Sequence, residues 1–140
     1  MRFIDTNIIL RYLVKPKTPA DDTKHHACLA LFQRVRAGTE QVTTCEAVVT
    51  EVLYNLCSPR QYNLSHAESV ARVRPLLALR HLHLPQKRVY LQALELFSVS
   101  PALDIEDAII VAHMEQRRLK ELLSYDTDFD PITGILRQEP

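Results

Sequence analysis

Short segments with strand character alternate with longer segments of helical periodicity, and this alternation constrains the fold more than any other feature of the chain. The strand-like segments are apolar or β-branched, and they cover residues 2–4, 41–44, 81–84, 122–125 and 132–136. The helical segments lie between them, at residues 8–14, 21–36, 45–56, 65–79, 87–97 and 104–118. Such an order predicts βαβ units, and therefore an α/β fold with a central parallel sheet and helices on both faces.

Several helix ends carry recognisable capping residues. Ser65 and Glu68 have the spacing of a capping box, which predicts a helix start at this point. Gly38 follows the second helical segment and is expected to stop it. Thr44 precedes the third helical segment, and we expect its hydroxyl to cap that helix.

The composition fits one globular domain that spans residues 1–140. Hydrophobic residues make up 46% and charged residues 24%, so the chain can bury a core and is unlike a disordered sequence. The net charge of zero neither favours nor excludes nucleic-acid binding, which depends on how charge is distributed. Three cysteines without metal-ligand spacing, and the lack of a membrane-length apolar run, predict a cytoplasmic protein with no membrane partner.

Four acidic residues are expected at one edge of the predicted sheet. Asp5 and Asp126 each end a strand-like segment, Glu51 lies about two turns into the third helical segment, and Asp107 lies in the first turn of the last one. In parallel sheets, ligands gather beyond the carboxyl ends of the strands. We therefore expect these four side chains, which are far apart in the sequence, to converge there.

Helical phase separates these acids from their acidic neighbours. In the last helical segment, Asp104 and Asp107 flank the apolar stripe, whereas Glu106 projects to the opposite side. In the third helical segment, Glu51 borders the apolar face and Glu46 points elsewhere. Asp107 and Glu51 are therefore the better candidates for a site.

The chemistry of several carboxylates in one cleft predicts a divalent cation. Taken singly, each acid has a structural explanation as a helix cap or a turn residue. Together they repel one another unless a proton or a cation neutralises them. Hard ions such as Mg²⁺ or Mn²⁺ prefer oxygen ligands, and they can activate water and stabilise phosphoryl oxygens.

Four blocks in this order resemble the PIN-domain family, and within it most of all the small VapC-type toxins of prokaryotic toxin–antitoxin pairs. The blocks are FIDTNIIL at 3–10, VTEVL at 49–53, LDIEDAIIVA at 103–112 and LSYDTDF at 123–129. The resemblance implies a three-layer α/β/α sandwich. It also implies a Mg²⁺- or Mn²⁺-dependent endoribonuclease, with RNA as the substrate.

The resemblance also assigns roles by position. Asp5 and Asp107 match the metal ligands, and Glu51 and Asp126 match the remaining catalytic acids, which would act through water or a second ion. Asn7 matches the residue that orients the first aspartate. The possible supporting residues are Asp104, Asp128 and Ser124, the last standing where the family often has threonine. A small antitoxin and a homodimer are the partners that the resemblance implies.

Two other readings stay open. A PIN-like module that binds RNA or protein without catalysis would have the same fold. The presence of all four acids argues against it, because a protein that binds no metal would be more stable without some of these mutually repelling carboxylates. A phosphoaspartyl-type phosphohydrolase needs a second acid two residues after the first, and Asn7 occupies that position. Several basic clusters lie on helical segments, and none of them singles itself out as an RNA contact.

Overall fold

The computed structural model describes all 140 residues and contains six α-helices, one 3-10 helix and five short strands. The elements in order are β1 (Arg2–Phe3), α1 (Thr6–Leu13), α2 (Pro19–Ala37), β2 (Val42–Thr43), α3 (Glu46–Cys57), α4 (His66–Leu77), β3 (Leu82–His83), α5 (Lys87–Val99), α6 (Ile105–Gln116), β4 (Glu121–Leu123), η1 (Thr127–Phe129) and β5 (Leu136–Gln138). No helix combines the length and the apolar character that a membrane span requires.

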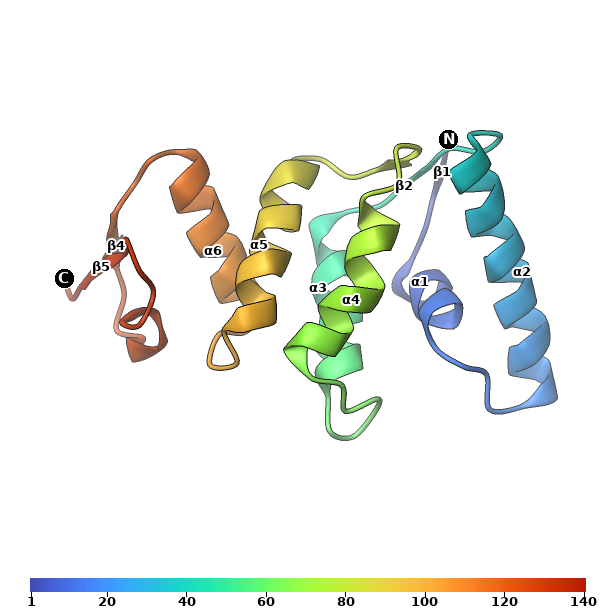
Figure 1. Ribbon diagram of the computed structural model, residues 1–140, viewed down its shortest axis with the longest axis horizontal. Helices are drawn as coiled ribbons and strands as arrows, with labels where there is room; N and C mark the ends of the chain where they lie inside the picture. Colours follow the sequence, from blue (N-terminus) through green and yellow to red (C-terminus); the bar gives the residue numbers. More distant parts are fainter.

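The parallel sheet predicted from the sequence is present, with the strand order β1-β2-β3. Helix α2 lies on one side of this sheet and helices α3 and α4 lie on the other, which gives the three layers of an α/β/α arrangement (Figure 1). The last two strands do not join this sheet. β4 and β5 pair in parallel with each other and form a separate ribbon at the opposite end of the molecule from β1 (Figure 1).

Two hydrophobic clusters match this division. The main cluster contains 25 buried residues and includes Ile105, Ala108 and Ile109 from α6. A second cluster of 4 buried residues joins α6 to the C-terminal segment; its members are Val111, Met114, Phe129 and Ile135. Helix α6 therefore packs on both sides, and its position between two apolar surfaces explains why its sequence is apolar nearly all round.

The predicted helix ends are confirmed in two cases and wrong in one. Ser65 and Glu68 form a reciprocal capping box, and Gly38 ends α2 with a φ of 80°. Thr44, however, does not cap α3, because Cys45 occupies the capping position. The buried Thr44 hydroxyl instead donates to the Ile4 carbonyl at 3.1 Å, where it satisfies a backbone acceptor at the end of β1.

The final strand lies further along the chain than the sequence pattern predicted. We expected it at residues 132–136, whereas β5 covers Leu136–Gln138. Gly134 has a φ of 87°, so the backbone turns at this point instead of extending. Ile132 and Ile135 are apolar because they pack against the second cluster under α6, which the pattern alone could not distinguish from a strand.

Candidate active site

The first acidic group lies where β1 ends and α1 begins. Asp5 caps α1, and its Oδ1 accepts a hydrogen bond from the Thr6 backbone N–H at 2.7 Å. Its Oδ2 accepts a second one from the Asn7 side-chain amide at 3.0 Å. The Thr6 hydroxyl donates to Oε2 of Glu51 on α3 at 2.7 Å. Thr6 therefore connects the predicted residues Asp5 and Glu51, which are 46 positions apart in the sequence.

The second acidic group lies where α6 begins and β4 ends. Asp104 caps α6 and accepts a hydrogen bond from the Asp107 backbone N–H at 2.9 Å. Burial, together with the negative charges of Asp104, Asp126 and Asp128, raises the pKa of Asp107 to about 6. The carboxyl of Asp107 is thus repelled by the negative charges of three other acids, and a bound cation would relieve this repulsion.

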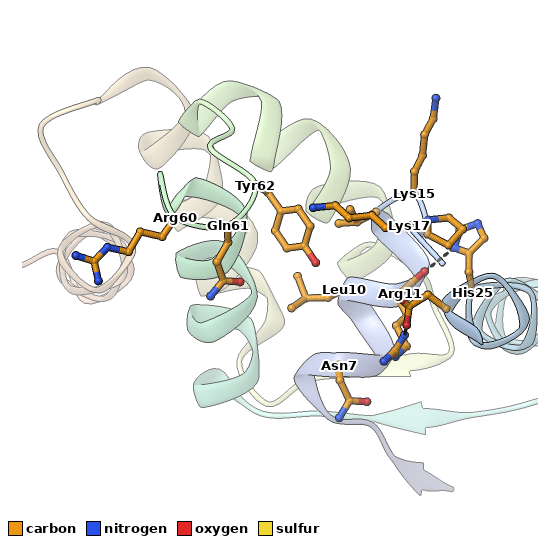
Figure 2. Close-up of a pocket in the computed structure, with 12 residues that line it drawn as sticks. Asn7, Leu10, Arg11, Lys15, Lys17, His25, Arg60, Gln61 and Tyr62 are labelled. Atoms are coloured by element: carbon orange, nitrogen blue, oxygen red, sulfur yellow. Dashed lines mark hydrogen bonds and ion pairs between the residues drawn. The ribbon is translucent and has the colours of Figure 1, made fainter. Parts of the chain in front are cut away.

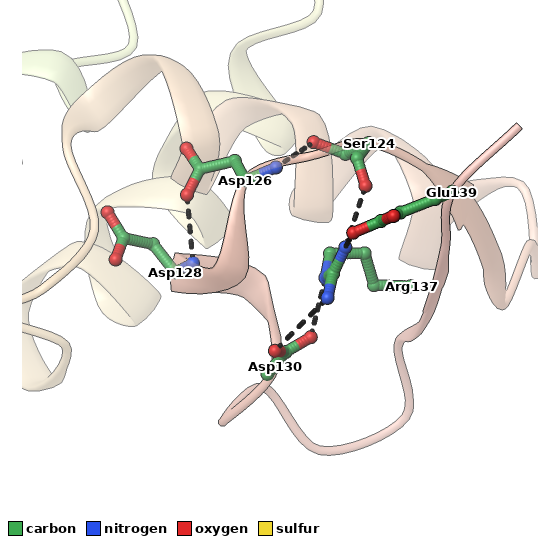
Figure 3. Close-up of polar contacts among 6 residues, drawn as sticks. All are labelled: Ser124, Asp126, Asp128, Asp130, Arg137 and Glu139. Atoms are coloured by element: carbon green, nitrogen blue, oxygen red, sulfur yellow. Dashed lines mark hydrogen bonds and ion pairs between the residues drawn. The ribbon is translucent and has the colours of Figure 1, made fainter.

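Ser124 and Asp126 shape the turn that follows β4. The Ser124 hydroxyl accepts a hydrogen bond from the Asp126 backbone N–H at 3.0 Å, and Asp126 accepts one from the Asp128 backbone N–H at 2.8 Å (Figure 3). The nearby Arg137 contacts neither of these two acids and pairs instead with Asp130 at 2.7 Å (Figure 3). This pairing raises the pKa of Arg137.

No Lys or Arg pairs with any of the six candidate acids. The salt bridges of the molecule involve other carboxylates, namely Asp21, Asp22, Glu40, Glu95, Asp130 and Glu139. Five of the six candidates are exposed, and Asp107 is half-buried. Their oxygens are therefore available to an external cation, which suits the chemistry of a hard divalent ion.

The structure does not gather the predicted acids into one cluster within a single chain. Nowhere do three or more His, Cys, Asp or Glu side chains lie close enough together to hold one metal ion. Asp5 follows β1, and Glu51 on α3 is joined to α1 through Thr6, whereas Asp126 follows β4, which lies in the separate ribbon at the opposite end of the molecule from β1 (Figure 1). The carboxylate oxygens are thus suitable ligands for a divalent ion, but within one chain the acids lie too far apart for three of them to hold the same ion.

A basic pocket of about 380 Å³ opens beside the first acidic group (Figure 2). Asn7 lines this pocket as well as contacting Asp5, so the two features adjoin. Three further lining residues, Lys15, Lys17 and Arg60, form no salt bridge. A fourth cation, that of Arg11, is paired with Asp21 at 2.8 Å.

Comparison with known protein families matches residues 2–134 to the PIN domain. The chain belongs to the PIN domain family. No curated protein matches it. Because PIN domains are generally nucleases, the family supports a nuclease-type enzyme, and PIN nucleases generally use divalent metals. The two acidic groups of this PIN domain are thus the candidate active-site residues.

Some residues of this PIN domain were not found by sequence reasoning. Thr6 falls between the predicted strand at residues 2–4 and the predicted helix at residues 8–14, and only the packing of α1 against α3 shows its contact with Glu51. The cations of the basic pocket were missed because they are isolated in the sequence and come from two separate segments. The prediction that Glu46 points away from the site is confirmed. Glu46 does point elsewhere, toward α5, where it accepts a hydrogen bond from the Tyr90 hydroxyl at 3.0 Å.

Proposed function

We propose that this PIN domain is an endoribonuclease that hydrolyses RNA phosphodiester bonds with Mg²⁺ or Mn²⁺. The observation that carries the proposal is the crowding of Asp107 by Asp104, Asp126 and Asp128 with no cationic side chain paired to any of them. A bound divalent cation would stabilise a fold that holds such mutually repelling carboxylates. The family supports the nuclease class, and the choice of RNA is part of the proposal.

The proposed roles of the acids are those that the resemblance to the PIN-domain motifs implies. Where the two acidic groups meet, Asp5 and Asp107 would hold the ion, with support from Glu51 and Asp126, and the ion would supply an activated water and offset charge on the phosphate oxygens. The α1 N-terminus and Asn7 hold both oxygens of the Asp5 carboxylate in a fixed orientation.

The basic pocket supports a nucleic-acid substrate. Lys15, Lys17 and Arg60 offer three unpaired positive charges in the pocket that Asn7 also lines. Since phosphates dominate nucleic-acid affinity, an RNA backbone that lies along this pocket would be led past Asp5. The net charge of zero conceals this local concentration of positive charge.

The direct test is RNA cleavage by the purified chain with Mg²⁺, with Mn²⁺ or with EDTA. We expect cleavage with either metal and none with EDTA. Asp5→Asn should lower the rate by more than about 100-fold, the scale on which the loss of one charge-stabilising group acts. Asp22→Asn, at an exposed acid on α2 outside both groups, is the matched control and should cleave normally. Cleavage in EDTA, or full activity of Asp5→Asn, would reject the proposal.

A role as the cytoplasmic toxin of a toxin–antitoxin pair extends the proposal. Such a toxin would be held inactive by a small antitoxin encoded beside it. Expression of the chain alone should then arrest growth, and Asp5→Asn should relieve the arrest. Normal growth during expression of active enzyme would remove the toxin role and leave the nuclease intact.

A non-catalytic binding module is the second candidate, and the separation of the two acidic groups favours it. Calorimetry with Mn²⁺ distinguishes the two functions. A module without catalysis should bind Mn²⁺ weakly or not at all, whereas the nuclease should lose most of its Mn²⁺ binding in Asp107→Asn.

A further inference from the structure

Two parallel strands of this chain each have one open edge. β1 is the terminal strand of the three-stranded sheet, and its backbone hydrogen bonds go to β2 alone. β4 has β5 as its single partner. Open edges present unpaired N–H and C=O groups and are templates for another strand. A two-stranded ribbon is also marginal by itself, so it gains from a third strand.

Apolar side chains are exposed on β1 and on the β4–β5 ribbon. Phe3 on β1 is 61% exposed, and Leu123 at the end of β4 is 67% exposed. Tyr125, which follows β4, is 70% exposed, and Leu136 on β5 is 58% exposed. A groove of about 320 Å³ runs beside β1, and seven of its nine lining residues are hydrophobic. Large apolar side chains grouped at an unpaired edge indicate an interaction surface.

The β4–β5 ribbon is held away from β1 of its own chain. Phe129 and Ile135 bury their side chains against Val111 and Met114 on α6. The connection from α6 to β4 spans residues 117–120, and its Leu119 N–H bonds back to the Met114 carbonyl at 2.8 Å. Helices α3, α5 and α6 lie between the ribbon and β1 (Figure 1). The ribbon could reach its own β1 only by leaving the second cluster.

We propose that two copies of this chain form a dimer in which β4 of each copy pairs in parallel with β1 of the other. This arrangement pairs the β1 and β4 edges of both copies and closes under two-fold symmetry, so neither of these two edges is left to recruit further copies. The inference rests on the proposed nuclease function, because the role of the dimer would be to complete one active site with acids from two chains.

The composite site follows from where the acids stand on the two strands. Asp5 lies two residues beyond β1 and Asp126 lies three residues beyond β4. Both strands run toward the same side of the molecule in Figure 1. Since paired strands lie about 4.8 Å apart, pairing β4 with β1 brings these two carboxylates to neighbouring positions. Asp5 and Glu51 of one copy would then face Asp107 and Asp126 of the other.

The first experiment measures mass by light scattering at micromolar concentration. We expect twice the 16.1 kDa of one chain. Leu123→Lys should shift the protein to monomer, since an exposed leucine can be replaced without loss of the fold but a lysine there opposes strand addition. Val99→Lys, at a site 76% exposed and away from both edges, should remain dimeric. A monomeric wild type, or a dimer that Leu123→Lys leaves unchanged, would overturn the inference.

The second experiment co-expresses Asp5→Asn and Asp126→Asn chains that carry different tags. Each variant alone is expected to be inactive. In the composite dimer, one of the two sites in every mixed dimer regains all its acids, so random pairing should restore about one quarter of the wild-type activity and Mn²⁺ binding. Sites built within single chains would stay inactive in the mixture, and that outcome would overturn the inference.

The two experiments separate this inference from the proposed nuclease function. If the wild type forms the Leu123-dependent dimer but cleaves no RNA, the dimer stands and the nuclease proposal fails. If the wild type cleaves RNA but the mixed variants remain inactive, the nuclease stands and the strand-paired dimer fails.

Discussion

At the scale of single residues, the hydroxyl of Thr6 joins two acids that the sequence places far apart. Thr6 is 6% exposed, and its contact with Glu51 is a hydrogen bond to a charged acceptor. Such bonds are among the stronger ones in proteins. The backbone of the same residue binds Asp5. Thr6 is thus a positioning residue, which orients acids without offering a ligand of its own.

Thr6→Val should destabilise the chain by about 2 kcal/mol, because valine keeps the shape of threonine but leaves the Glu51 oxygen without its donor. Urea unfolding followed by circular dichroism would measure the change. Thr6→Ser is the matched control, since serine keeps the hydroxyl, and it should lose less. Equal losses in the two variants would show that the hydroxyl does not carry the effect.

Asp107→Asn should stabilise the metal-free chain at neutral pH. The pKa of Asp107 is raised from 3.8 to about 6, first by burial and then by its acidic neighbours, so ionisation above pH 6 opposes folding. The gain should be roughly 1 kcal/mol at pH 7.5, because solvent screens part of the repulsion. It should disappear as the pH falls from 6 to below 4, where the wild-type carboxyl is protonated.

Urea unfolding of the wild type and Asp107→Asn across this pH range, in EDTA, provides the measurement. Glu106→Gln is the control, since Glu106 is exposed on the same helix and should show no such trend. A stability difference that is independent of pH would contradict the crowding of Asp107.

At the scale of elements, the three unpaired cations of the basic pocket lie in connections between helices. Lys15 and Lys17 follow α1, and Arg60 lies between α3 and α4. Connections of this kind often carry binding residues, because the helices around them hold them in place. The positive charge thus arises from how α1 and α3 pack, and neither segment is basic enough to reveal it.

Lys17→Gln should weaken RNA binding to a similar degree for unrelated RNA sequences. The slope of log affinity against log salt should fall by about 0.7 for each phosphate contact that is lost on a single strand. Fluorescence anisotropy at several salt concentrations would measure it. Lys24→Gln, at an exposed lysine on α2 outside the pocket, should leave the slope unchanged. Equal effects of the two variants would remove the pocket from the RNA path.

At the scale of the whole molecule, the two acidic groups belong to different parts of the fold. The main core holds the three-stranded sheet and carries Asp5 and Glu51. The second cluster holds the β4–β5 ribbon and the turn that carries Asp126. Helix α6 takes part in both and presents Asp107 at its start. A complete metal site therefore depends on how these parts meet, and strand pairing between two copies would join them.

The sequence by itself determined the order of the elements and the helix ends at Ser65 and Gly38, and it supplied the acids that are the candidate site residues. The capping box at Ser65 and the stop at Gly38 act within a few residues, so local chemistry decides them. Helical phase likewise distinguished Glu51 from Glu46.

Only the tertiary structure decided which strands pair and which side chains meet. Strands of two or three residues carry too little pattern to specify their neighbours, so the separation of β4 from β1 could not be read from the chain. The Thr6–Glu51 contact and the basic pocket likewise join segments that are distant in sequence. Contacts of this kind depend on how helices pack, whereas caps and periodicity depend on residues a few positions apart.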